Sequence, residues 1–124
     1  MPRTKVIFYS DEKGSCPVFD WLKTLPAKAR DKCRVRLERL AEMGHELRRP
    51  EADLLRDKIY ELRASAQGIH YRILYFFHGN TVAVAAHGIV KEGAVPGPEI
   101  ERALGRKALF ESNPAKHTYT RAAS

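Results

Sequence analysis

The fold is decided by three runs of sequence: KIYELRA at residues 58–64, IHYRILYFFH at 69–78 and TVAVAAHGIV at 81–90. All three are rich in β-branched and aromatic residues, which favour extended backbone. Short turn stretches separate them, SAQG at 65–68 and GN at 79–80, and each contains a glycine that accepts the backbone angles of tight turns. The pattern therefore predicts three consecutive strands joined by two hairpins.

Outward from these runs, the sequence predicts one strand before them and helices on either side. Cys33, Leu37 and Leu40 recur at the spacing of one buried helical stripe. We therefore expect an α+β fold, in which an antiparallel four-stranded sheet (one N-terminal strand, three consecutive later strands) packs against two N-terminal helices and one C-terminal helix. The expected segments are a strand at 4–9, a helix from Ser15 or Cys16 to a break at Pro26, a helix at 27–43 capped by Gly44, a charged loop at 45–56 and a helix at 99–112, in a single domain over 1–112 followed by a flexible tail at 113–124.

Length and composition limit the class of protein. The chain has 124 residues, of which 44% are hydrophobic, which favours one packed domain without a separate cofactor domain. Neither a long apolar run nor a signal-peptide pattern occurs, so we expect a cytoplasmic protein without membrane contact. Cys16 and Cys33 then read as free thiols of a reducing compartment, and the scattered histidines predict no metal site and no cofactor.

The chain is basic, with 22 Lys and Arg against 15 Asp and Glu, and its formal net charge is +7. Such an excess favours a polyanionic partner such as nucleic acid, or an acidic protein. Much of the positive charge lies on the outer surface of the predicted helix at 27–43, which includes Arg34, Arg36 and Arg39. This surface reads either as a solvated face or as a set of phosphate contacts to a substrate.

The two hairpins also gather polar residues on one face of the sheet. A two-residue turn at 79–80 places Arg72 opposite His87, and a four-residue turn at 65–68 places Arg72 opposite Glu61. A two-residue shift of the second register keeps the same facing. The polar end of this face then holds Glu61, Arg63, His70, Arg72, His87 and Lys91, with Phe76 farther along the same face.

This cluster combines groups that suit phosphate chemistry. A guanidinium fork donates paired hydrogen bonds to phosphate oxygens, and an imidazole takes up and releases protons near neutral pH. Phe76 either stacks a base or packs in the core. The alternative is an ordinary solvated ion network, in which the pairs of Glu61 with Arg63 and Arg72 contribute little to stability.

Three stretches of the predicted strands carry a resemblance to a known family: YELR at 60–63, YRILYF at 71–76 and HGIVK at 87–91. Over roughly residues 4–112 the chain resembles the RelE/ParE toxin superfamily of type II toxin–antitoxin modules, and within it the phage-derived HigB-like branch. The resemblance implies a small RelE-like domain and a toxin that cuts mRNA on the ribosome as a metal-independent endoribonuclease. It also implies a cognate antitoxin, acidic or of the helix-turn-helix type, as a partner beside the mRNA and the ribosome.

The resemblance further implies roles in a reaction in which the RNA 2′-OH attacks the adjacent phosphate and the 5′-oxygen leaves. Arg72 corresponds to the phosphate-binding arginine, and Arg63 and Lys91 are supporting cations. His87 or His70 would transfer protons, and Glu61 would serve as general base or neutralise Arg72.

Two other functions remain open at this point. The same fold serves ParE-like gyrase inhibitors and inactive antitoxin-binding scaffolds, so a non-nucleolytic binding protein is the alternative. A plain RNA- or DNA-binding domain that uses the basic helix at 27–43 is the third.

Overall fold

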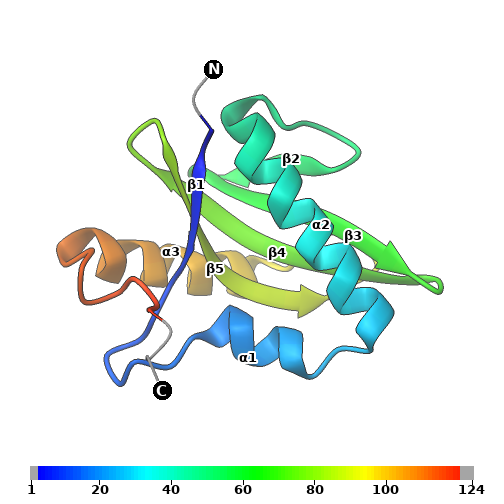
Figure 1. The fold of residues 1–124 in the computed structure, drawn as a ribbon, viewed down its shortest axis with the longest axis horizontal. Helices are drawn as coiled ribbons and strands as arrows, with labels where there is room; N and C mark the ends of the chain where they lie inside the picture. Colours follow the sequence, from blue (N-terminus) through cyan, green and yellow to red (C-terminus); the bar gives the residue numbers. More distant parts are fainter. Residues whose placement is uncertain (1–2, 121–124) are drawn as a thin grey trace.

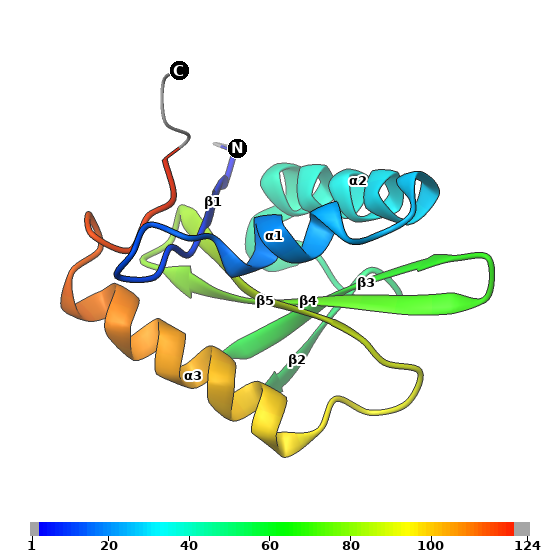
Figure 2. The same cartoon turned by 90° about the horizontal axis from the view of Figure 1, so that it is seen from below.

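The computed structural model describes residues 3–120. The chain folds into a five-stranded mixed sheet with helices on both faces (Figure 1). Helices α1 and α2 cover one face of the sheet and α3 covers the other, as Figure 2 shows. No helix within the described residues has an apolar stretch long enough to cross a membrane. The elements in chain order are β1 (Lys5–Phe8), α1 (Pro17–Lys23), α2 (Ala27–Met43), η1 (Gly44–Glu46), β2 (Ala52–Arg56), β3 (Ile59–Ala66), β4 (Ile69–His78), β5 (Val82–Val90) and α3 (Gly97–Ser112).

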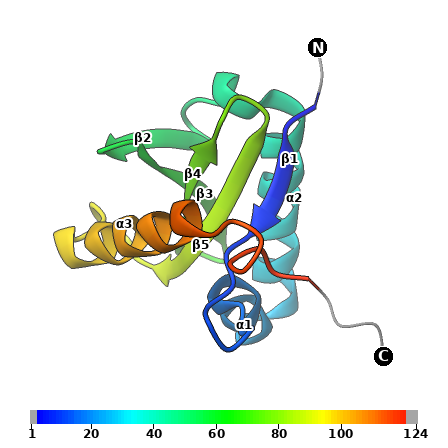
Figure 3. The ribbon, with the colours of Figure 1, turned by 90° about the vertical axis from the view of Figure 1, so that its left-hand side faces the viewer.

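The strand order across the sheet is β1-β5-β4-β3-β2, with β1 and β2 at opposite edges (Figure 3). The predicted α+β class, its three helices and its four expected strands are confirmed. Two details differ from the prediction, because the sheet has a fifth strand and β1 runs parallel to β5. No tight turn joins β1 to its neighbour, so nothing local in the sequence fixes the direction of that pairing.

The fifth strand, β2, lies within the segment that the sequence predicts to be a charged loop. Ala52 pairs antiparallel with Leu62, and Arg56 pairs with Ile59. Ala52 is buried in the core under α1 and α2, and Leu55 packs against the core under α3, whereas Leu54 is exposed. Charged residues on both sides of this short strand conceal it in the sequence.

The hairpin between β3 and β4 is tighter than predicted. Its turn consists of Gln67 and Gly68, whose φ angles of 53° and 79° are those of a type I′ turn. Arg63 therefore lies opposite Arg72, where the prediction placed Glu61. Because this shift is by two residues, every side chain keeps its predicted face. The structure accordingly keeps Glu61, Arg63, His70 and Arg72 on one face of the sheet.

The hairpin between β4 and β5 departs from the predicted register by one residue. Its turn has three residues and pairing resumes at Val82, which reverses the predicted facing of residues 82–85. A β-bulge then adds one residue to β5 before His87 and restores the predicted facing beyond it. Arg72 lies opposite Ile89 as a result, and not opposite His87.

Each face of the sheet has its own apolar core, and burial of one large apolar side chain stabilises the fold by about 1.5–3 kcal/mol. The face that the sequence predicts to be polar is apolar along most of its length, because α3 packs on it. The core under α1 and α2 holds Val18, Leu22, Cys33, Leu40, Leu62, Ile73, Tyr75, Ala83 and Ala85, and the core under α3 holds Ile59, Leu74, Phe76, Val84, Ala86, Ile100, Ala103 and Phe110.

The segment after α3 folds back along β1, although the sequence assigns it to a flexible tail. The Tyr119 N–H donates to the Phe8 carbonyl at 2.8 Å, and Thr118 forms a bridge with Tyr9. The buried His117 ring stacks on Tyr9 at 5.4 Å between centroids and donates from Nδ1 to the Ser10 carbonyl at 2.8 Å. The predicted tail is thus packed as far as Tyr119, and its last residues, 121–124, lie outside the described part of the chain.

We expect Gly88→Ala to lower the free energy of unfolding by about 1–3 kcal/mol, because overpacking of a filled core has this cost. A Cβ on Gly88 would overlap the indole ring of Trp21, so β5 or α1 would have to move. Urea denaturation measures the change. The control is Gly105→Ala in α3, where a Cβ meets nothing within 4 Å and helix propensity favours alanine. Equal destabilisation of the two variants would contradict the close packing of α1 on β5.

Candidate functional site

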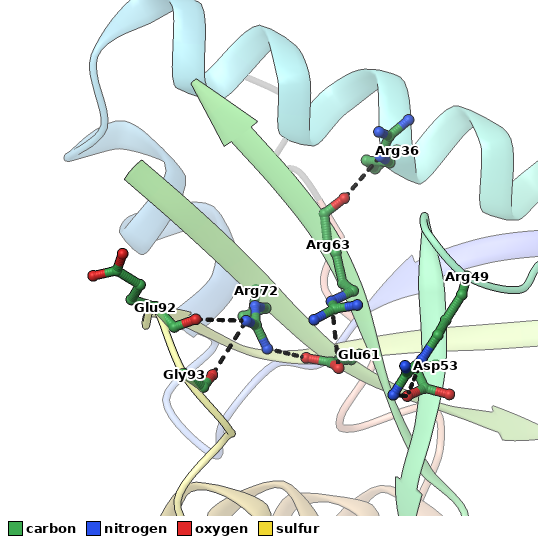
Figure 4. A network of polar contacts seen from close by, with 8 residues as sticks. All are labelled: Arg36, Arg49, Asp53, Glu61, Arg63, Arg72, Glu92 and Gly93. Carbon is green, nitrogen blue, oxygen red and sulfur yellow. Dashed lines mark hydrogen bonds and ion pairs between the residues drawn. The ribbon is translucent and has the colours of Figure 1, made fainter. Parts of the chain in front are cut away.

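A buried ion pair between Arg72 of β4 and Glu61 of β3 forms the centre of the candidate site (Figure 4). The Arg72 Nη1 donates to Glu61 Oε1 at 2.6 Å, and both side chains are only 5% exposed. The Arg72 Nη2 donates to the carbonyl oxygens of Glu92 and Gly93 at 3.3 and 3.2 Å. Arg72 therefore joins two strands of the sheet to the loop that follows β5.

Arg63 lies beside this pair and is more accessible. Its side chain is 35% exposed, and its Nε lies 3.7 Å from Glu61 Oε2. The Arg36 Nε donates to the backbone carbonyl of Arg63 at 2.7 Å, so α2 holds this point of β3 in place (Figure 4). Arg36 also pairs with Glu51 at 3.4 Å. Arg36 and Glu61 together fix where the Arg63 side chain starts and in which direction it leaves the sheet.

Two adjoining cavities open on either side of Arg63 and Arg72. The first has a volume of about 330 Å³ and the second about 500 Å³, and Arg63, Arg72 and Glu92 line both. The other residues that line the first cavity are Arg36, Pro50, Ala64, Ser65 and His70. The second cavity is completed by Arg49, Asp53, Leu55, Arg56, Glu61, Gly93, Ala94, Val95 and Ile100.

The first cavity is suited to an anion. Three guanidinium groups and the imidazole of His70 line it together with a single carboxylate, that of Glu92. Guanidinium groups donate paired hydrogen bonds to phosphate or carboxylate oxygens. The second cavity adds an apolar wall from Leu55, Val95 and Ile100, which gives the neighbouring part of a ligand a surface to pack against.

His87 is on the predicted face of the sheet but in a different environment. It is buried under α3, where Nε2 lies 3.0 Å from Glu99 Oε1 and Nδ1 lies 3.1 Å from Arg106 Nη1. A guanidinium can only donate, so Nδ1 accepts and the ring proton resides on Nε2, facing Glu99. Burial lowers the pKa of His87, and the hydrogen bond to Glu99 opposes this shift. The arrangement keeps a neutral imidazole between β5 and α3, and His87 lines neither cavity.

The remaining predicted site residues lie apart from the two cavities. Phe76 is fully buried, and its ring centroid lies 5.7 Å from that of Phe110. It therefore packs in the core and presents no ring face to a base. Lys91 is exposed on the strand end after β5, and its backbone N–H donates to the His70 carbonyl at 3.1 Å. On α2, Arg34 pairs with Glu38 at 2.7 Å and Arg39 with Glu51 at 3.2 Å.

The site also contains residues that the sequence analysis did not identify. Pro50 and Ser65 line the first cavity, and Arg49 and Asp53, which pair at 2.7 Å, line the second. Three of these four, Arg49, Pro50 and Asp53, precede or belong to β2, and recognition of that strand would have drawn attention to them. Within residues 3–120 the His, Cys, Asp and Glu side chains form no group of three or more that could hold a metal ion.

Comparison with protein-family models matches residues 20–108 of the chain to the family described as "Phage derived protein Gp49-like (DUF891)". The matched range contains β2 to β5 and every residue that lines the two cavities. A comparison with curated proteins finds no match.

Removal of one partner from the central ion pair should be costly. We expect Arg72→Met to lower the free energy of unfolding by about 3–5 kcal/mol, because it leaves the buried Glu61 carboxylate without its partner. The double variant Glu61→Gln/Arg72→Met should lose clearly less free energy of unfolding than Arg72→Met, since it leaves no buried charge unpaired. Denaturant unfolding of the single and double variants measures both values. If the losses of the single variants Arg72→Met and Glu61→Gln add up to the loss of the double variant, the two side chains are not coupled.

The environment of His87 predicts how stability depends on pH. Because its pKa is lowered in the folded chain, the unfolded chain binds its proton first, and stability is lost as the pH falls through about 6.5, the ordinary value for histidine. At higher pH the stabilising neutral form is fully present. We expect His87→Gln to flatten the fall in the free energy of unfolding below this pH, while His70→Gln, at an exposed position, leaves it intact. Identical pH profiles for wild type and His87→Gln would contradict this prediction.

Proposed function

The chain belongs to the Gp49-like family of phage-derived proteins, and on this basis we propose that it is the toxin of a type II toxin–antitoxin module, of the HigB-like kind, that cleaves mRNA on the ribosome. The family is consistent with a toxin-like module. The observation that carries the nuclease proposal is the convergence of Arg36, Arg63, His70 and Arg72 on one cavity of about 330 Å³.

The proposed reaction needs a positive site for the phosphate and a group that removes a proton. In the reaction the RNA 2′-oxygen forms a bond to the adjacent phosphorus, and the bond from phosphorus to the 5′-oxygen breaks. Arg63 supports this proposal, because a partly exposed guanidinium can stabilise charge that develops on the phosphate oxygens. His70 is the histidine that lines the cavity, and its imidazole would accept the 2′-OH proton.

Other residues of the site are less suited to proton transfer. Glu61 is buried and is held by Arg72, so protonation of its carboxylate would leave a buried guanidinium without its counter-charge. His87 is held between Glu99 and Arg106. We therefore propose His70 over His87 and Glu61 as the general base, and the departing 5′-oxygen takes its proton from solvent.

The partners proposed for this toxin follow from its charge. A net charge of +7 favours approach to ribosomal RNA and to mRNA, since electrostatic attraction raises the rate of association with polyanions. The same charge suits a cognate antitoxin with an acidic surface. We propose that the antitoxin covers the two cavities or the exposed side of α2.

One observation favours a second candidate function, a non-nucleolytic member of the same fold. Glu61 neutralises Arg72, and a site with fewer free cations could bind an antitoxin or gyrase without cutting RNA. The two candidates differ in what their expression does to the cell. A gyrase inhibitor produces double-strand breaks in DNA and leaves mRNA intact, and an inactive scaffold has no toxicity.

Expression of the chain without an antitoxin tests the proposal. We expect growth arrest and new mRNA 5′ ends within translated regions, and Arg63→Gln should reduce the cleavage rate by about 10²–10³-fold, as loss of one transition-state donor does. His70→Gln should reduce it by a similar or larger factor. The control is Arg102→Gln, at an exposed position of α3 outside both cavities. DNA breaks with intact mRNA would overturn the nuclease proposal, and unchanged cleavage by Arg63→Gln would overturn the role of Arg63 in it.

A further inference from the structure

We propose that Arg72 is a positioning residue, which acts on the anion site through Glu61, and that Arg63 makes the contact with the phosphate. This inference rests on the proposed function, because it assigns roles within the same site. It reverses the roles that the resemblance implies for the two arginines.

The hydrogen bonds of Arg72 leave it little capacity for a ligand. Its Nη1 donates to Glu61 at 2.6 Å, and its Nη2 donates to two backbone carbonyl oxygens, those of Glu92 and Gly93. The side chain is 5% exposed. A phosphate that took the place of Glu61 on this guanidinium would leave the Glu61 carboxylate buried without a counter-charge.

Arg63 has the opposite properties. About a third of its side chain is exposed, and it lines both cavities. Its contact with Glu61 at 3.7 Å is an ion pair without a hydrogen bond. Within residues 3–120 the Arg63 guanidinium donates no hydrogen bond, so its planar fork is available for two oxygens of a phosphate.

Glu61 connects the two arginines. One carboxylate oxygen, Oε1, accepts from Arg72, and the other, Oε2, faces Nε of Arg63 (Figure 4). Arg72 thereby fixes the carboxylate, and the carboxylate restrains the near end of the Arg63 guanidinium while leaving its far end open to the cavities. Arg72 also holds the backbone of residues 92 and 93, which forms a wall of the second cavity.

The charges of these three side chains lead to the same assignment. Glu61 and Arg72 cancel each other, so the positive charge that a ligand meets at this point is that of Arg63. Arg36 is the nearest further cation of the first cavity, and Glu51 offsets part of its charge. A phosphate bound in this cavity would therefore be neutralised mainly by Arg63, and its counterions would be released to the solvent.

The first test uses the wild-type protein, so it does not depend on whether a variant folds. The side-chain Nε–Hε signals of the arginines are followed by NMR during titration with inorganic pyrophosphate and then with a single-stranded RNA oligonucleotide. We expect the Arg63 signal to shift with saturation while the Arg72 signal stays in place. A shift of the Arg72 signal that equals the shift of Arg63, or no shift of Arg63 with either probe, overturns the inference.

The second test counts phosphate contacts through the salt dependence of RNA affinity. Loss of one contact to a single strand lowers the slope of log K against log salt concentration by about 0.7. We expect this decrease for Arg63→Gln. We expect no decrease for Glu61→Gln/Arg72→Gln, which leaves the net charge of the site unchanged but weakens binding. A lower slope for the double variant that matches Arg63→Gln would overturn the inference.

A third measurement separates positioning from charge and from the proposed function. Arg72→Lys keeps the positive charge, but one ammonium group cannot take the place of the two Arg72 nitrogens that hold Glu61 and the two carbonyls, so RNA affinity should stay below that of the wild type. Arg63→Lys should keep the wild-type salt slope. Wild-type RNA affinity of Arg72→Lys would overturn the assignment of Arg72 as a positioning residue. If the Arg63 signal shifts with both probes and the chain cuts no mRNA, the nuclease proposal fails while the assignment of the two arginines stands.

Discussion

The buried pair of Glu61 and Arg72 is the constraint on which the rest of the site depends. Two opposite charges have been removed from water, and loss of either partner would leave the other charge buried without compensation. This requirement fixes the position of β3 against β4, and the remaining donors of Arg72 bring in the loop after β5. The residues that a ligand would meet are therefore arranged around a pair that the ligand itself does not need to touch.

The same principle explains why the large net charge says little about the site. Many of the cations on α2 are matched locally, as Arg34 is by Glu38 and Arg39 by Glu51. Exposed pairs of this kind add little to stability, and they leave a general positive field around the molecule. In the proposed function this field attracts a polyanion to the surface, and a much smaller set of groups at the end of β3 and β4 is proposed to bind it.

The sequence predicts the class of fold, the helices and four strands, because periodicity and turn residues are local signals. It also predicts which of Glu61, Arg63, His70 and Arg72 share a face, because a register error of two residues does not change the parity of a strand. The prediction fails for β2, because this short strand lies among charged residues. The facing of His87 is predicted correctly only because an extra turn residue and a β-bulge compensate, and no local pattern shows that α3 covers it.

The return of residues 117–119 to β1 has a consequence for the order in which the protein is assembled. β1 spans residues 5–8, whereas the segments that pair at this edge of the sheet, β5 and the segment around Thr118, lie far from it in the sequence. Contacts of such long sequence separation form late, because the intervening chain must first be made and then closed into a loop. β1 can therefore pair only after β5 and residues 117–119 have been synthesised.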